Sequence, residues 1–375
     1  MNFSKLDRLM DTMPLRGIPG CELIVTKNGQ TAYRRASGTA NRATGKPVDE
    51  KTLWWIYSAS KISTCVAAMQ LVEKGRISLD DPVSKYLPSF ARLKVQTPDG
   101  VKACETPMRI IHLFTMTGGL DYAMSEPEVK RAYEAGEDTV AVVSAMANKT
   151  LLFEPGAHYH YSLCHDVLGA VVAKVSGMSL SEYLKKNLWL PLGMEDTGFT
   201  PTAEQKARLA DMYSFDHSKG EAHPVPLPER PYDNVNYESG GGGVFSCAGD
   251  YAKLMTALSL GGVSPDGVRV LKPETVRMLE VNRLSDECRR DLWRERLYGY
   301  GWGLCGRVHM NAEYSLARSS VGEFGWDGAA AAFALADRPK GVAMFFATHV
   351  HNCSYAYCWV HPKIRDLAYE AMEDN

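Results

Sequence analysis

The sequence lacks an excess of charge of either sign. Its 42 lysines and arginines are balanced by 44 aspartates and glutamates, which leaves a formal net charge of -2. A surface that binds nucleic acid or an anionic membrane needs a basic excess, so the sequence predicts neither partner. Apolar residues never run for the roughly 20 positions that a membrane-spanning helix requires, and no membrane span is predicted.

Cysteines are present but lack the spacing of a disulfide framework. There are nine, an odd number, scattered from Cys21 to Cys358. The first residues mix charged and apolar side chains, without the apolar core of a secretion signal. They predict an amphipathic helix that Pro14 closes; its apolar positions are Phe3, Leu6, Leu9, Met10 and Met13. Reduced thiols without a secretion signal predict a cytoplasmic protein.

Several site signatures are also missing. The sequence contains no G-x-S-x-G nucleophile elbow and no H-E-x-x-H zinc motif. His158, His160 and His165 lie close together but have no companion acidic or cysteine motif, so they predict no metal site. Residues 301–306 fit G-x-G-x-x-G but open no helix of a βαβ unit. We therefore expect neither a metal nor a cofactor.

Residues 53–75 contain the first candidate catalytic residues. An apolar, aromatic run at residues 53–57 predicts a strand, and a pattern of helical period leads from Ser58 to Gly75. Ser58 and Lys61 are nearly one helical turn apart and share a face. A serine hydroxyl needs a neighbouring base, and a buried lysine can become one. Ser58 is thus a candidate nucleophile with Lys61 as its base; the alternative is a plain N-cap serine.

Two later motifs add candidate site residues. Tyr161 stands in the segment HYHYSLCHDVLG, and a phenol near an ammonium group can act as a general acid or base. Its alternative is a packing tyrosine. Residues 324–329 read FGWDGA, where Trp326 offers an apolar wall for stacking. Asp327 is either a turn residue or a negative charge that selects amine-bearing substrates.

Taken in order, these motifs resemble the serine β-lactamases of class C, the penicillin-binding proteins and their esterase relatives. The segments RISLDDPVSKYLP after the helix and HLFTMTGGL further on support the resemblance. Lactamases read Y-x-N and K-T-G where this chain has Tyr161-Ser162-Leu163 and Trp326-Asp327-Gly328. The chain is closer to a carboxylesterase and acyltransferase branch that reads Y-S-x-x-x-D-V-L-G and W-G-G.

The resemblance implies a fold and a site. The fold is α/β and two-lobed: residues 1–75 and 236–375 form a lobe with an antiparallel sheet flanked by helices. Residues 76–235 form a mainly helical lobe with surface loops, and the active site lies in the cleft between the lobes. The backbone amides of Ser58 and of Ala329, at the start of a strand, hold the oxyanion. The side of the cleft that meets the substrate is formed by Tyr159, His160, Trp326, Asp327 and Gly328.

The function implied by the resemblance is that of a serine hydrolase working through an acyl-enzyme. A carboxylesterase or acyltransferase on small esters is the first expectation. A β-lactamase or D-amino-acid peptidase is the alternative. The missing lysine of K-T-G argues against it, because that cation would bind a substrate carboxylate. A third alternative is an inactive scaffold of the same fold. The sequence leaves the oligomeric state open.

Overall fold

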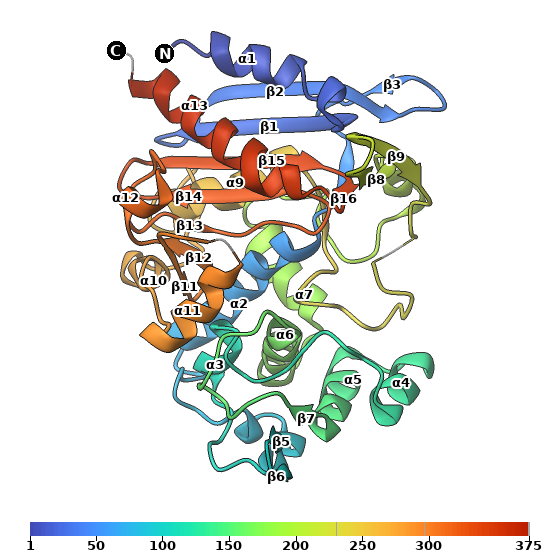
Figure 1. Ribbon diagram of the computed structural model, residues 1–375, viewed down its shortest axis with the longest axis vertical. Helices are drawn as coiled ribbons and strands as arrows, with labels where there is room; N and C mark the ends of the chain where they lie inside the picture. The colour runs from blue at the N-terminus through green and yellow to red at the C-terminus, as the bar shows by residue number, and fades with distance from the viewer. Residues whose placement is uncertain (230, 296, 374–375) are drawn as a thin grey trace.

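An eight-stranded antiparallel sheet forms the upper half of the molecule (Figure 1). The computed structural model describes residues 1–229, 231–295 and 297–373. The strand order is β11-β12-β13-β14-β15-β1-β2-β3, so strands from the two ends of the chain lie side by side. The strands are β1 (Gly20–Lys27), β2 (Gln30–Asn41), β3 (Lys46–Pro47), β11 (Tyr300–Gly303), β12 (Gly306–His309), β13 (Phe324–Gly325), β14 (Phe333–Asp337) and β15 (Val342–Thr348).

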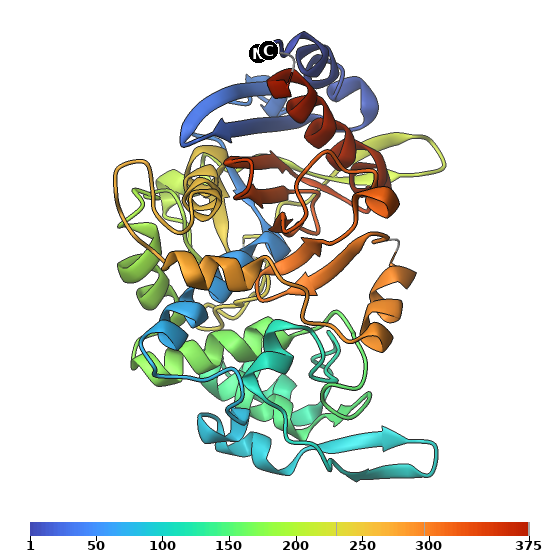
Figure 2. The ribbon, with the colours of Figure 1, turned by 90° about the vertical axis from the view of Figure 1, so that its left-hand side faces the viewer.

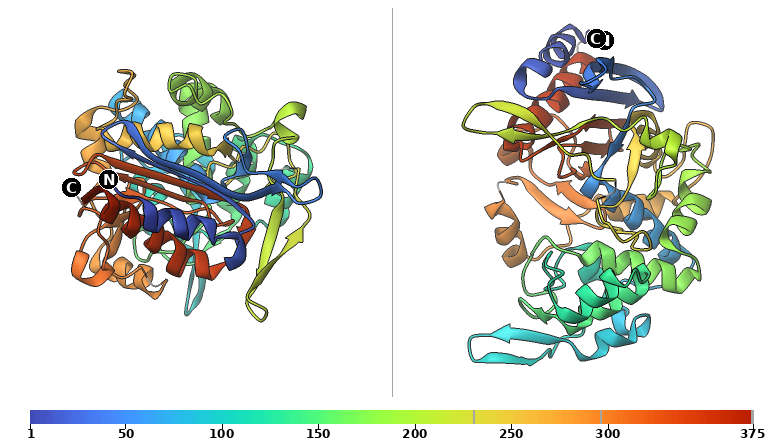
Figure 3. Two further views of the ribbon diagram at one scale, coloured as in Figure 1. Left: turned by 90° about the horizontal axis from the view of Figure 1, so that it is seen from above. Right: turned by 90° about the vertical axis from the view of Figure 1, so that its right-hand side faces the viewer.

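Helices cover both faces of this sheet. In the view from above, α1 (Ser4–Asp11) and α13 (His361–Glu373) lie on one face and α9 (Ala248–Ser259) on the other (Figure 3). Successive side chains of a strand point to opposite faces. Accordingly Leu23 packs with the α1 and α13 cluster, while its neighbour Ile24 packs with the main core. The central strands are buried on both sides and read as nearly continuous apolar runs.

The lower half of the molecule is mainly helical (Figures 1 and 2). Its core is α6 (Cys164–Ser176), which is buried from its first residue to Ala173 and packs on α2 (Ser60–Glu73). Around α6 lie α3 (Ile110–Phe114), α4 (Pro127–Glu134), α5 (Thr139–Ala145) and α7 (Leu180–Leu184). These helices match the expected ones in type. The lobe boundaries near residues 75 and 235 stay a prediction.

Two β-hairpins were not expected from the sequence. The first, β5 (Lys94–Thr97) with β6 (Gly100–Ala103), extends from the helical half and pairs with β7 (Thr150–Leu151) (Figure 2). The second, β8 (Met212–Asp216) with β9 (Glu221–Val225), lies within residues 76–235, where helices and surface loops were expected. It escaped prediction because β8 pairs with β16 (Val350–His351), a partner far along the chain.

The remaining elements are short, and most border the sheet. They are β4 (Leu53–Trp55), β10 (Phe245–Cys247), α8 (Ala203–Lys206), α10 (Pro273–Leu279), α11 (Asp286–Arg294) and α12 (Ala312–Ser315). Residues 230 and 296 lie outside the described residues. No single helix within the described ranges is long and apolar enough to cross a membrane, although α6 and the segment Leu180–Trp189 pass that test together as a bent pair.

A buried lysine fastens the loop between α3 and α4 to the helical half. Lys149 has a side chain only 2% exposed. Its Nζ lies 2.8 Å from Asp121 Oδ1 and 3.0 Å from Glu126 Oε2, and it donates a hydrogen bond to the carbonyl of Ala123. The loop that these three contacts hold carries Tyr122, which belongs to the candidate site below.

We expect Lys149→Met to destabilise the protein by about 1–3 kcal/mol, because two carboxylates lose their cation while the aliphatic stem is kept. Breaking a fully buried ion pair costs about 3–5 kcal/mol, and the carboxylates here are partly exposed. The measurement is urea unfolding. Lys130→Met is the matched control: Lys130 pairs with Glu134 at 3.7 Å with both side chains more than 60% exposed, so its loss should stay within about 0.5 kcal/mol. Equal losses would contradict the role of Lys149.

Candidate active site

Ser58 lies in a strained turn between β4 and α2. The 3₁₀ turn Tyr57–Ala59 leads directly into the helix, and Tyr57 has a φ of 45°. A left-handed backbone is rare for an aromatic residue and persists only where the surroundings enforce it. Here the amide of Ile56 donates to the carbonyl of Val244 at 3.0 Å, and the hydroxyl of Tyr251 donates to the carbonyl of Ala59. The turn leaves Ser58 half-exposed at the helix N-terminus.

Lys61 lies one turn further on and is 1% exposed. Its Nζ donates three hydrogen bonds: to Ser58 Oγ at 3.2 Å, to the hydroxyl of Tyr122 at 3.0 Å and to the carbonyl of Gly241 at 2.6 Å. A lysine ammonium group has three hydrogens, and each therefore has an acceptor. The predicted proximity of Ser58 and Lys61 is thus observed, in a geometry that suits the charged form of the lysine.

The phenol that contacts the lysine nitrogen is Tyr122, which the sequence reasoning missed. Tyr161 was expected there; instead Lys61 Nζ lies 4.7 Å from the centre of its ring. The two tyrosine rings are 5.6 Å apart and tilted, so both belong to the same cluster. Tyr122 is 43% exposed as a residue, but the enclosed position of its hydroxyl beside Lys61, followed by the neighbouring Tyr161, raises its pKa well above the usual value. Its only sequence signal is its place two residues after Leu120, at the end of the HLFTMTGGL segment.

An aromatic wall stands beside this cluster. The indole nitrogen of Trp326 donates to the hydroxyl of Tyr161 at 2.8 Å, and the ring of Trp326 packs edge-on against Trp302 at 4.4 Å. Tyr159 packs against Trp302 and is 4% exposed, and its contact with the substrate stays a prediction. It supports the wall from the core. His160 is exposed, and its amide donates to the carbonyl of Met116.

The chain after Trp326 approaches the Ser58 turn closely. A Cβ on Gly328 would lie 2.3 Å from the carbonyl oxygen of Ile56, so only a glycine fits at this contact. Ala329 is exposed in the turn that follows; it does not begin a strand as expected, because β14 starts at Phe333. The hydroxyl of Tyr357 donates to the carbonyls of Gly328 and Ala329 at 2.7 and 3.0 Å, which fixes the orientation of this turn.

Asp327 faces a buried arginine. Its Oδ1 accepts from Arg307 Nη1 at 2.7 Å, and its Oδ2 lies 3.7 Å from Nδ1 of His361. Arg307 is 5% exposed. Burial would raise the pKa of Asp327, but Arg307 and His361 outweigh it and hold the pKa below its usual value. The carboxylate is therefore already neutralised, and the expectation that it selects amine-bearing substrates is not supported by its contacts.

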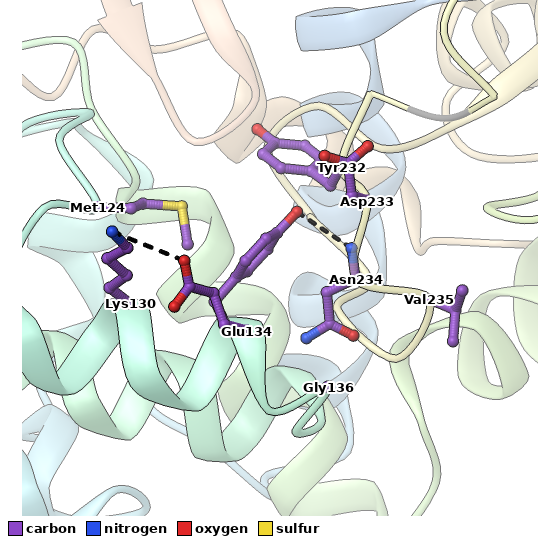
Figure 4. A pocket seen from close by; sticks show the side chains of 9 residues that line it. Met124, Lys130, Glu134, Gly136, Tyr232, Asp233, Asn234 and Val235 are labelled. Atoms are coloured by element: carbon purple, nitrogen blue, oxygen red, sulfur yellow. Dashed lines mark hydrogen bonds and ion pairs between the residues drawn. The ribbon is translucent and has the colours of Figure 1, made fainter.

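A cavity of about 690 Å³ lies between Met124, helix α4 and the chain at residues 232–235 (Figure 4). Tyr232 belongs to its wall, and the hydroxyl of Tyr232 lies 3.4 Å from the position of a Cβ on Gly242, next to the Gly241 that binds Lys61. On the opposite side, Met124 follows Tyr122 by two residues. The lining consists of Met124, Lys130, Tyr133, Glu134, Gly136, Tyr232, Asp233, Asn234 and Val235. Four of these side chains are apolar or aromatic (Met124, Tyr133, Tyr232 and Val235), and four are charged or polar (Lys130, Glu134, Asp233 and Asn234).

The histidines of the HYHY segment do not converge on a metal. Nδ1 of His158 lies 3.0 Å from Asp291 Oδ2, whereas His165 is buried with Nε2 3.4 Å from Cys65 Sγ. Within residues 1–229, 231–295 and 297–373, no group of three His, Cys, Asp or Glu side chains could hold a metal ion.

Comparison with known proteins agrees with the fold and the motifs. The family model described as Beta-lactamase matches residues 6–353. The chain is 28% identical over 383 residues to the esterase EstB of Burkholderia gladioli, covering 92% of this chain and 90% of that protein. The structure of EstCE1, described as a hydrolase with promiscuous acyltransferase activity, superposes with a TM-score of 0.81 at 26% identity, over 98% of both chains.

A second solved structure, the simvastatin synthase LovD of Aspergillus terreus, superposes over the whole of both chains with a TM-score of 0.82 at 20% identity. These likenesses confirm the predicted α/β fold of the serine β-lactamase and penicillin-binding-protein type. The chain thus combines a Ser-x-x-Lys pair with this fold, and the proteins it resembles include an esterase and a hydrolase with acyltransferase activity. We conclude that the chain belongs to the beta-lactamase family of serine hydrolases, in its esterase and acyltransferase branch.

Proposed function

We propose that the protein is a carboxylesterase that cleaves small esters through an acyl-enzyme on Ser58. The observation that carries the proposal is the cluster of Ser58, Lys61, Tyr122 and Tyr161 at one helix N-terminus. The Ser58 hydroxyl lies beside an amine and two phenols, which are groups that can take up and return its proton. The helix N-terminus adds positive potential where the oxyanion develops.

The chemistry follows from these groups. In the reactive form, Lys61, Tyr122 and Tyr161 together hold one proton fewer than when all three are protonated. Ser58 Oγ then attacks the ester carbonyl, and its proton fills that vacancy in the group. The amides of Ser58 and Ala329 are the proposed donors to the oxyanion. When the tetrahedral intermediate collapses, the same group returns the proton to the leaving alcohol. Water then attacks the acyl-enzyme and releases the acid; an alcohol or amine in its place would make the reaction an acyl transfer.

The substrate side of the proposal rests on the aromatic wall and the cavity. Trp326 and Tyr161 pack as a tilted aromatic pair, and the cavity beside Tyr232 offers apolar and aromatic surface from Met124, Tyr133, Tyr232 and Val235 next to charged side chains. Such a site favours neutral esters with an apolar or aromatic part. A β-lactamase or peptidase is less well supported, because Trp326 stands where the lysine of K-T-G would bind a substrate carboxylate. A cytoplasmic location is proposed from the nine cysteines, which all carry free thiols.

Ser58→Ala should abolish hydrolysis of p-nitrophenyl esters, because the attacking oxygen is gone while the side chain stays small. Intact mass after treatment with a fluorophosphonate probe should show one adduct on the wild type and none on Ser58→Ala. Ser63→Ala, a serine of the same helix whose oxygen accepts from Trp189, should still be labelled. An unlabelled wild type, or a labelled Ser58→Ala, would sink the proposal.

Tyr122→Phe and Tyr161→Phe should each lower kcat/KM by at least about 100-fold, since general acid–base help is typically worth about 10²–10⁴-fold. Both changes keep the ring and its packing. The control is Tyr159→Phe, because the hydroxyl of Tyr159 is buried without a hydrogen-bond partner in the described structure. Its activity should stay within a few-fold of the wild type. If Tyr122→Phe behaves like this control, Tyr122 is not part of the catalytic group.

Asp327→Asn should destabilise the protein without changing its charge preference. The substitution leaves the buried Arg307 with Glu323 as its nearest carboxylate, at 3.9 Å, and losing one partner of a buried pair costs about 3–5 kcal/mol. Urea unfolding measures that loss. The ratio of kcat/KM for an amino ester and its neutral isostere should be the same in both proteins. A lower ratio in Asp327→Asn than in the wild type would show that Asp327 does select amine-bearing substrates.

A further inference from the structure

A buried carboxylate lies behind the catalytic lysine and has no part in the mechanism described so far. Asp166, on α6, is 0% exposed. Its Oδ1 accepts from the hydroxyl of Tyr237 at 2.9 Å and from Ser239 Oγ at 2.5 Å. These partners are donors, and a carboxylate that receives donated hydrogen bonds in the core is stabilised in its charged form.

The second oxygen of this carboxylate has no side-chain partner and faces Gly241, whose backbone amide helps to hold the pKa of the carboxyl down. A Cβ on Gly241 would lie 2.4 Å from Asp166 Oδ2 and 3.4 Å from Lys61 Nζ. The absence of a side chain at Gly241 therefore lets the two groups face each other. A buried carboxylate held by neutral donors alone is unfavourable unless a nearby cation compensates its charge, and Lys61 is placed to do so.

The other titratable groups around Lys61 supply no negative charge. The phenols of Tyr122 and Tyr161 face it from loops, and burial raises the pKa of Tyr122. Burial lowers the pKa of His165, next to Asp166 on α6, well below its usual value, so that imidazole is neutral. The thiols close to Lys61 belong to Cys65 on its own helix and Cys164 on α6; burial raises the pKa of both.

We propose that Asp166 is the buried counter-ion of Lys61, a positioning residue that keeps the ammonium group against Ser58 across Gly241. The inference rests on the proposed function, because it concerns the same serine site. Burial raises the pKa of the Asp166 carboxyl, and Ser239, Lys61 and Tyr237 oppose that rise. The peptide of Gly241 serves both groups: its carbonyl binds Lys61, while its α-carbon leaves the path to Asp166 open.

A charge at this place has a consequence for the pH dependence of catalysis. A carboxylate that faces an ammonium group raises the pH at which the ammonium loses its proton, and it also opposes ionisation of neighbouring phenols. Where neighbouring groups share protons, the acid limb of kcat/KM reports the whole group and not a single residue. With the Asp166 charge present, the acid limb of kcat/KM therefore lies at higher pH than it would without that charge.

The first test compares pH profiles of kcat/KM for a neutral p-nitrophenyl ester. In Asp166→Asn the acid limb should move to lower pH by about 1–3 units, the usual effect of an opposite charge at this range. The control is Asp337→Asn. Asp337, on β14, is another fully buried carboxylate, and it accepts a hydrogen bond from the hydroxyl of Tyr369. Its limb should stay in place. A limb that is unmoved in Asp166→Asn, at whatever overall activity, overturns the proposal.

The second test needs no activity and covers the case in which Asp166→Asn alone does not fold. Lys61→Met leaves the Asp166 carboxylate buried without a cation, so thermal unfolding should occur at a lower temperature than in the wild type. Adding Asp166→Asn to Lys61→Met removes the orphaned charge, and the double variant should be the more stable of the two. A double variant no more stable than Lys61→Met overturns the proposal. If the wild type cleaves no ester, the proposed function fails while this comparison still decides the counter-ion.

Discussion

The site depends on the need to satisfy a buried ammonium group. Lys61 is enclosed, and each of its three hydrogens must find an acceptor in the core. The acceptors come from the helix itself through Ser58, from the α3–α4 loop through Tyr122 and from the glycine loop through Gly241. Three segments far apart in the chain are therefore held together by one nitrogen. The same contacts place the nucleophile, the phenol and the backbone around it.

Close backbone approach is the second constraint on the cleft. At Gly241 the chain passes between a carboxylate and the lysine, and at Gly328 it meets the carbonyl of Ile56. Any side chain at either place would push apart the elements that build the site. Together with the left-handed backbone at Tyr57, these contacts show a site assembled under steric strain and held by the packing of both halves of the molecule.

Neighbouring residues of the motif after β13 have separate roles because a nearly extended chain turns successive side chains to opposite sides. Trp326 joins the aromatic wall of Tyr161 and Trp302 beside the catalytic cluster. Asp327 turns to Arg307 and His361, so it ties the chain after β13 to β12 and α13. One residue thus lies on the aromatic wall and the next belongs to a buried ion pair, and the sequence motif alone does not show this difference.

The sequence by itself determined the two-lobed α/β fold class, the Ser58 and Lys61 pair and the family resemblance. The Ser58 and Lys61 pair is local: a helical step of three residues and a run of apolar residues follow from neighbours in the chain. Only the tertiary structure decided that Tyr122 binds Lys61, that Asp327 pairs with Arg307 and that β8 finds β16. Each of these contacts joins residues separated by at least 20 positions, and such pairs carry no periodicity. These contacts form only when the sheet and the helical half pack together.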